Sequence, residues 1–131
     1  MTPVDAFATL AANEQAVLVD CRTEAEWNYV GTPDLSTLGK SLIAIEWLNY
    51  PDGRINAEFV AHFVEHGVPR DEPVFFLCRS GVRSIAAAEA ATEAAYVAAY
   101  NILEGFEGPL GSDGARNQSG WKVSGLPWAQ S

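Results

Sequence analysis

The sequence has few basic side chains. Lysine and arginine together number 8, against 17 aspartates and glutamates, so the formal net charge of the 131 residues is −9. Proteins that bind nucleic acid or an anionic membrane surface need a basic footprint, and we expect neither kind of partner. An anionic ligand has to be attracted by a local cluster of cations against the field of the whole molecule.

Long apolar runs and cysteines are also scarce. No stretch approaches the length of a membrane span, and residues 1–12 lack a basic n-region, because the first cationic side chain is Arg22. Two cysteines, Cys21 and Cys78, do not make a disulfide scaffold. Hydrophobic residues make up 48% of the chain, which is enough for the core of one domain over residues 1–131. We therefore expect a soluble, cytoplasmic, single-domain protein.

Short apolar runs alternate with helical patterns along the chain. The patterns predict strands at residues 16–21, 41–47, 74–77 and 100–103. They predict helices at residues 4–12 after a Thr2 cap, after a Thr23 capping box, from Asn56 to residue 67, and at residues 84–95. Residues 31–39 are expected to form a loop, 49–54 a turn and 119–124 a last helical turn. This alternation predicts an α/β fold, an open and mostly parallel sheet with helices on both faces.

The most informative stretch runs from Pro73 to Ala95. An apolar run at residues 74–77 ends on Cys78, a polar loop with one glycine follows, and an alanine-rich helix comes next. Cys78 therefore lies at the carboxyl end of a buried strand and just before a helix. Open α/β sheets place their ligand sites there.

The residues after Cys78 favour a thiolate at this position. Arg79 and Arg83 supply two cations, Gly81 relieves the tightest part of the turn, and the helix start offers unpaired N–H groups and the positive end of its dipole. Each feature stabilises a thiolate over a thiol. We predict Cys78 as a nucleophile, within an anion-binding loop made of Arg79, Ser80, Gly81, Val82, Arg83 and Ser84.

Three stretches resemble the rhodanese (sulfurtransferase) family. The run CRSGVRS at residues 78–84 resembles the family's active-site loop. LVDCRTEAEW at residues 18–27 is similar to its first strand with an Asp-x-Arg and an acidic-aromatic helix, and GWKVSGLP at residues 120–127 resembles its closing motif. Two segments depart from the pattern: residues 30–46 replace the usual His-Ile-Pro-Gly-Ala stretch, and the segment from Glu107 to Ser119 is longer and richer in glycine.

The resemblance implies a thiosulfate sulfurtransferase of the rhodanese-like fold that works by double displacement. A Cys78 persulfide would carry sulfane sulfur from thiosulfate to cyanide or another thiol, with no metal or organic cofactor. The resemblance also implies that Asp20 and Arg22 help to hold the site, with Asp20 paired to an arginine of the loop. A structural ion pair on the sheet rim is the alternative for these two residues.

Other residues leave alternatives open. Cys21 could act as a resolving thiol for the persulfide, although a cysteine at a strand end is more often core packing. His62 and His66 have a spacing that can chelate zinc, but no third ligand is indicated, and a solvated helix face is the favoured interpretation.

Two rival functions also remain open. A Cdc25-like phosphatase or arsenate reductase would resemble a Cys-x5-Arg pattern, whereas Arg83 here follows Cys78 at Cys-x4-Arg. A sulfur relay to a protein partner would need the same persulfide, and the segment from Glu107 to Ser119 is the expected place for partner contacts.

Overall fold

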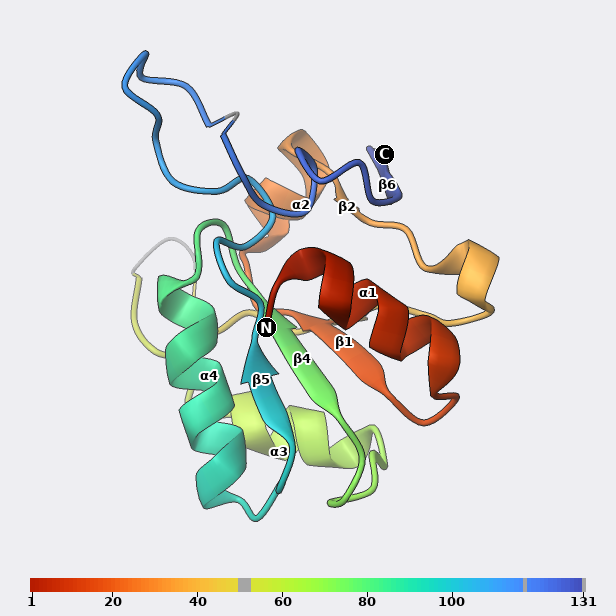
Figure 1. The fold of residues 1–131 in the computed structure, drawn as a ribbon. Coiled ribbons are helices and arrows are strands. Elements are labelled where there is room, and N and C mark those ends of the chain that lie inside the picture. The colour runs from red at the N-terminus through yellow and green to blue at the C-terminus, as the bar shows by residue number, and fades with distance from the viewer. Residues whose placement is uncertain (50–52, 117, 131) are drawn as a thin grey trace.

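The computed structural model describes residues 1–49, 53–116 and 118–130 (Figure 1). Its helices and strands, in chain order, are α1 (Pro3–Ala12), β1 (Val17–Asp20), α2 (Glu24–Tyr29), β2 (Thr32–Pro33), the 3₁₀ helix η1 (Ser36–Leu38), β3 (Ile43–Ala44), α3 (Phe59–Glu65), β4 (Val74–Leu77), α4 (Val82–Glu93), β5 (Ala99–Asn101) and β6 (Trp128–Ala129). No helix within these described ranges is long and apolar enough to cross a membrane.

Four of the described strands form the main sheet, in the order β3-β1-β4-β5, and every neighbouring pair in it is parallel. In the register, Asp20 lies opposite Leu77, and Phe76 lies opposite Asn101. The carboxyl ends of β1, β4 and β5 therefore meet at one edge of the sheet. The predicted parallel sheet is confirmed.

Both faces of this sheet are buried, because alternate strand residues point to opposite sides. Val19 and Phe76 pack in a cluster with side chains of α3 and α4, whereas Leu18 and Phe75 pack in a cluster with α1. Figure 1 shows α1 on one side of the sheet and α3 on the other. The prediction of helices on both faces is confirmed.

The predicted caps of the first two helices are present. Thr2 accepts a hydrogen bond from the Asp5 N–H at 3.2 Å, and Pro3 occupies the first helical position. Thr23 and Glu26 form the complete capping box that starts α2.

The third helix differs from the expectation. It begins at Phe59, because the Asn56 side chain makes a turn instead of capping a helix there: its Oδ1 accepts from the Glu58 N–H at 3.0 Å, and its Nδ2 donates to the Glu46 carbonyl at 2.9 Å. Its apolar side chains are not all buried, since Val64 is 37% exposed.

The strand expected at residues 41–47 is shortened to β3. Ile45 and Trp47 still donate to the Asp20 and Cys21 carbonyls at 3.1 Å, but they lie beyond the end of the strand. The turn expected at residues 49–54 includes residues 50–52, which lie outside the described part of the chain.

The C-terminal segment also differs. Residues 119–124 form turns and no helix, with a hydrogen bond of 3.0 Å from the Ser124 N–H to the Gly120 carbonyl. β6 pairs antiparallel with β2, which lies in the stretch expected to be a loop. Strands of two residues are too short to show a period-2 pattern, so the sequence could not indicate this pairing.

Candidate active site at the carboxyl edge of the sheet

Cys78 directly follows β4 and lies at the carboxyl edge of the sheet. It belongs to the cluster on the α3 and α4 side, and the residue is only 1% exposed. The Gly81 N–H donates to Sγ at 3.1 Å, and the Ser84 hydroxyl lies 3.2 Å from Sγ, in hydrogen-bond contact. Two groups of the segment predicted to surround the thiol therefore contact its sulfur.

The cysteine loop, which we define as residues 78–84, turns directly into α4. The helix begins at Val82, two residues earlier than expected, and Gly81 is its N-cap with a φ of 113°, in a region that other residues rarely adopt. Ser84 is fully buried in the first turn of α4. The sulfur thus lies close to the positive end of the α4 dipole.

The backbone of the cysteine loop is held from outside by residues 105–108. The Phe106 N–H donates to the Cys78 carbonyl at 2.8 Å, and the Glu107 and Gly108 N–H groups donate to the Arg79 carbonyl at 3.0 and 3.1 Å. Gly105 has a φ of 64°, and a Cβ added to it would lie 2.6 Å from the carbonyl carbon of Arg79. Only a glycine permits this close backbone approach.

The two loop arginines have different environments. Arg79 is exposed, whereas Arg83 makes a bidentate pair with Glu26 of α2, at 2.6 and 2.9 Å. Burial raises the pKa of Glu26, but the hydrogen bonds and charge of Arg83 outweigh it, so the pKa of this carboxyl lies below its usual value. Because the pair spans 57 positions, the sequence indicated Glu26 only as a capping residue.

Asp20 and Arg22 pair with each other. Arg22 Nη2 donates to Asp20 at 2.6 Å and to the Gly31 carbonyl at 2.7 Å, and both charged side chains are fully buried. The expected pairing of Asp20 with a loop arginine is therefore wrong, since Arg83 is engaged by Glu26. The guanidinium of Arg22 lies 4.3 Å from the centre of the Phe106 ring. The pair therefore supports the residue whose N–H holds the Cys78 carbonyl.

Cys21 lies in the same apolar cluster as Cys78, one position beyond β1. It is fully buried, and its thiol donates to the Leu77 carbonyl at 3.2 Å. Burial raises the pKa of Cys21 well above its ordinary value, and the negative charges of Cys78 and Asp20 act in the same direction. Its surroundings therefore favour a neutral thiol.

Asn101, at the end of β5, is a site residue that the sequence did not indicate. The Ser84 hydroxyl lies in hydrogen-bond contact with its Oδ1 and also with the Gly81 carbonyl, the latter at 3.2 Å. Asn101 lies 23 positions beyond Cys78, and only the register of β5 beside β4 brings it to the cysteine loop.

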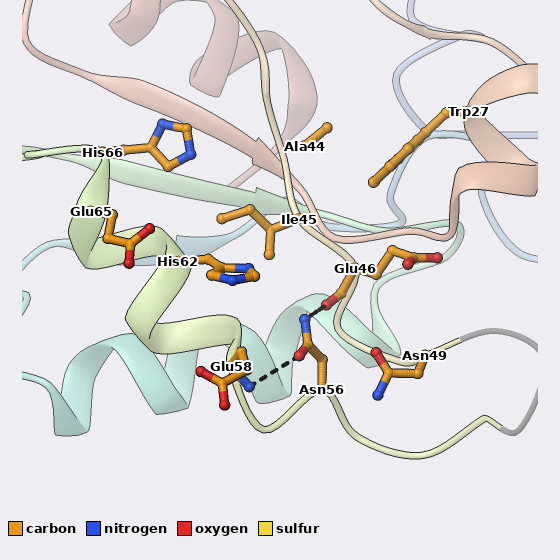
Figure 2. A pocket seen from close by; sticks show the side chains of 10 residues that line it. All are labelled: Trp27, Ala44, Ile45, Glu46, Asn49, Asn56, Glu58, His62, Glu65 and His66. Carbon is orange, nitrogen blue, oxygen red and sulfur yellow. Dashed lines mark hydrogen bonds between the residues drawn. The ribbon is translucent and has the colours of Figure 1, made fainter.

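A cavity of about 650 Å³ lies beside α3, and Figure 2 shows the side chains around it. Trp27 and Glu46 border it on one side, and the exposed His62 and His66 border it on the other, with Glu65 between them in sequence. None of its described lining residues belongs to the cysteine loop. Within the described ranges, no group of three or more His, Cys, Asp or Glu side chains could hold a metal ion.

The burial of Cys21 generates a prediction about its ionisation. Thiolate absorbance, taken as the difference between the wild type and Cys21→Ser, should stay flat up to about pH 9, where an exposed cysteine already ionises. The same difference measured in concentrated urea should show an ordinary cysteine titration. An ordinary titration in the folded protein would contradict the assignment of Cys21 as a buried, neutral thiol.

The close approach of Gly105 generates a second prediction. Gly105→Ala should lower the free energy of unfolding by about 2–4 kcal/mol, from left-handed backbone strain together with the clash against the Arg79 peptide. Gly39→Ala is the matched control, because Gly39 has a φ of 68° and nothing within 4 Å of an added Cβ. Urea unfolding of both variants measures the difference. Equal losses would show that the contact with the cysteine loop contributes nothing.

Comparison with known proteins places the chain in a family. All of residues 1–131 match the family model described as the STR4 middle domain. The uncharacterized protein RC0915 of Rickettsia conorii is 40% identical over 124 residues, which cover 94% of this chain and 90% of that protein. The chloroplastic rhodanese-like domain-containing protein 4 of Arabidopsis thaliana is 26% identical over 127 residues, covering 96% of this chain and 24% of that protein.

Solved structures agree with this assignment. The crystal structure of Rv0390 from M. tuberculosis has a TM-score of 0.92 and 52% identity, and the match covers 100% of this chain and 96% of that one. The polysulfide-sulfur transferase homodimer of Wolinella succinogenes has a TM-score of 0.70 and 21% identity, with 100% and 77% covered, which shows a shared fold. The chain belongs to the STR4 middle domain family, which is rhodanese-like.

Proposed function

We propose that the protein is a sulfurtransferase that carries sulfane sulfur on Cys78 as a persulfide. The observation that carries the proposal is the environment of Sγ, which has the Gly81 N–H at 3.1 Å and the Ser84 hydroxyl at 3.2 Å beside the start of α4. These groups stabilise negative charge on a sulfur atom. Membership of a rhodanese-like family supports the same chemistry.

The reaction proceeds in two displacements. The Cys78 thiolate attacks the outer sulfur of thiosulfate, a sulfur–sulfur bond forms to Sγ, and the bond to the inner sulfur breaks so that sulfite leaves with its electron pair. Cyanide or a thiolate then attacks the outer sulfur of the persulfide, and the Cys78 thiolate leaves. The Gly81 N–H beside Sγ favours this second step, because the charge that returns to the sulfur meets a backbone donor already in place.

Burial favours sulfur transfer over the phosphatase alternative. Because Cys78 is 1% exposed, a donor has to present a slender terminal atom, as the outer sulfur of thiosulfate is. A tetrahedral phosphoryl group would also need a loop cation to bind its oxygens. Arg83 is occupied by Glu26, with both guanidinium contacts below 3 Å, which leaves the exposed Arg79 for that role.

A protein sulfur acceptor is compatible with the same site. Figure 1 shows residues 109–116, drawn in blue, projecting away from the sheet. The two residues before this segment are tied to the cysteine loop through the Arg79 carbonyl, whereas Leu110 is 61% exposed. We propose this projecting segment as the contact for a protein acceptor.

Intact-protein mass spectrometry after incubation with thiosulfate tests the persulfide. The wild type and Cys21→Ser should each gain the mass of one sulfur, and cyanide should remove it. Cys78→Ser should gain nothing, because it lacks the nucleophile. A wild type that gains no sulfur but hydrolyses a phosphoryl ester or reduces arsenate would replace the proposal with the phosphatase-like alternative.

Shortening the projecting segment tests the acceptor contact. Residues 112–114 are the ones to remove, because the Gly111 N–H donates to the Ala115 carbonyl at 2.7 Å and residues 111 and 115 therefore already lie beside each other. With Leu110→Ser added, sulfur transfer to dithiothreitol should stay within about twofold of the wild type, since the contacts of Gly81 and Ser84 with Sγ are untouched. Transfer to reduced thioredoxin, a protein dithiol of the same chemistry, should be lost. Equal loss with both acceptors would contradict a protein-specific contact.

A further inference from the structure

The Ser84 hydroxyl has three hydrogen-bond neighbours but only one hydrogen to donate. It lies 3.2 Å from Cys78 Sγ and 3.2 Å from the Gly81 carbonyl, and it also contacts Asn101 Oδ1. A hydroxyl has one hydrogen to donate and two lone pairs to accept with. Since its two oxygen neighbours can only accept, Ser84 gives its hydrogen to one of them and accepts from the Cys78 S–H. This arrangement suits a neutral thiol.

Ionisation of Cys78 changes its sulfur from a hydrogen-bond donor to an acceptor. Once the thiol proton has left to solvent, the sulfur can only accept, and the Ser84 hydrogen has to turn toward it. Ser84 Oγ then faces Asn101 Oδ1 with no hydrogen between the two oxygens. The contact is favourable again only if Asn101 presents a donor to Ser84.

The amide of Asn101 can supply that donor without a change of position. Its oxygen and NH₂ group have almost the same shape, so a half-turn of the amide exchanges them in the same space. The residue itself is fixed, because Asn101 lies opposite Phe76 in the β4–β5 ladder, and the Ile102 N–H bonds to the Phe76 carbonyl at 2.9 Å. The amide also borders the cysteine loop, since its Nδ2 lies 3.8 Å from the position of a Cβ on Gly81.

We propose that Asn101 is a positioning residue for the Cys78 thiolate, and that its amide turns to donate from Nδ2 to Ser84 Oγ so that the Ser84 hydroxyl donates to Sγ. The inference rests on the proposed function, in which Cys78 reacts as a thiolate. Asn101 acts through Ser84 and has no direct role in bond making. An asparagine fits this position because it can accept in the thiol state and donate in the thiolate state.

The pH dependence of thiolate absorbance tests the relay, with each protein measured against its own Cys78→Ser counterpart. Asn101→Leu is similar in shape, adds no charge and removes the donor. It should raise the midpoint of the Cys78 titration by about half to one pH unit, since a hydrogen bond to a charged group is weakened. In a Ser84→Ala background, Asn101→Leu should cause no further shift.

Asn101→Asp is the second variant, and it guards against an Asn101→Leu protein that fails to fold. A carboxylate can accept but not donate, and its charge also disfavours a nearby thiolate, so Asn101→Asp should raise the midpoint by at least as much as Asn101→Leu. In a Ser84→Ala background Asn101→Asp should cause a smaller rise, because only the effect of the charge remains. An unchanged midpoint in the folded variants, or the same Asn101→Leu shift with and without Ser84, overturns the proposal. The titration uses no sulfur donor, so its failure is distinguishable from a failure of the wild type to gain sulfur from thiosulfate.

Discussion

The position of the thiol depends on the backbone hydrogen bonds that residues 106–108 donate to the carbonyls of Cys78 and Arg79. A turn between a strand and a helix leaves carbonyl groups unpaired, and buried carbonyls without partners are costly. The same segment is held from its other side, because the Trp121 and Lys122 N–H groups donate to the carbonyls of Gly105 and Phe106 at 2.9 and 3.1 Å. The closing motif, residues 120–127, therefore supports the cysteine loop indirectly, through the backbone of residues 105–108.

The buried ion pair belongs to this layered support. Asp20 and Arg22 touch neither the sulfur nor the loop arginines, yet Arg22 lies against the ring of Phe106. Removing one partner of a buried pair costs about 3–5 kcal/mol, because the other charge is left uncompensated. The pair is a structural ion pair, which was one of the two alternatives raised from the sequence. Through Phe106 it also supports the backbone that holds the cysteine loop, so the other alternative, a role in holding the site, describes part of the geometry as well.

The two cysteines show how local surroundings separate thiols that lie in the same apolar cluster. Cys21 donates to a carbonyl, and burial raises its pKa, so its surroundings stabilise the protonated form. Cys78 receives an N–H from Gly81 and touches a hydroxyl at the start of a helix. The residue type is the same and both are buried, but the neighbouring hydrogen bonds run in opposite directions, away from the Cys21 sulfur and toward the Cys78 sulfur.

Local patterns account for the features that the sequence predicted correctly. The sheet, the capping box at Thr23 and the position of Cys78 after β4 follow from apolar runs and cap residues within a few positions of each other. The pairing of Arg83 with Glu26 and the contact of Ser84 with Asn101 depend on which strands become neighbours, and no local signal carries that information. The sequence contains a glycine at position 105, but it does not show why a glycine is required there. The reason is the close contact with the Arg79 peptide, which only the folded structure reveals.

Acidic side chains pair with two of the arginines near the candidate site. Arg22 is paired with Asp20 and Arg83 with Glu26, so the positive charges of both are largely compensated within the molecule. The groups that contact Sγ are uncharged, namely the Gly81 N–H and the Ser84 hydroxyl. Such groups act at hydrogen-bond range, so they stabilise charge on the Cys78 sulfur more than they attract a distant anion. Their effect is therefore greatest when the persulfide bond breaks and charge returns to that sulfur. An interaction that is stronger in the transition state than in the bound substrate lowers the reaction barrier.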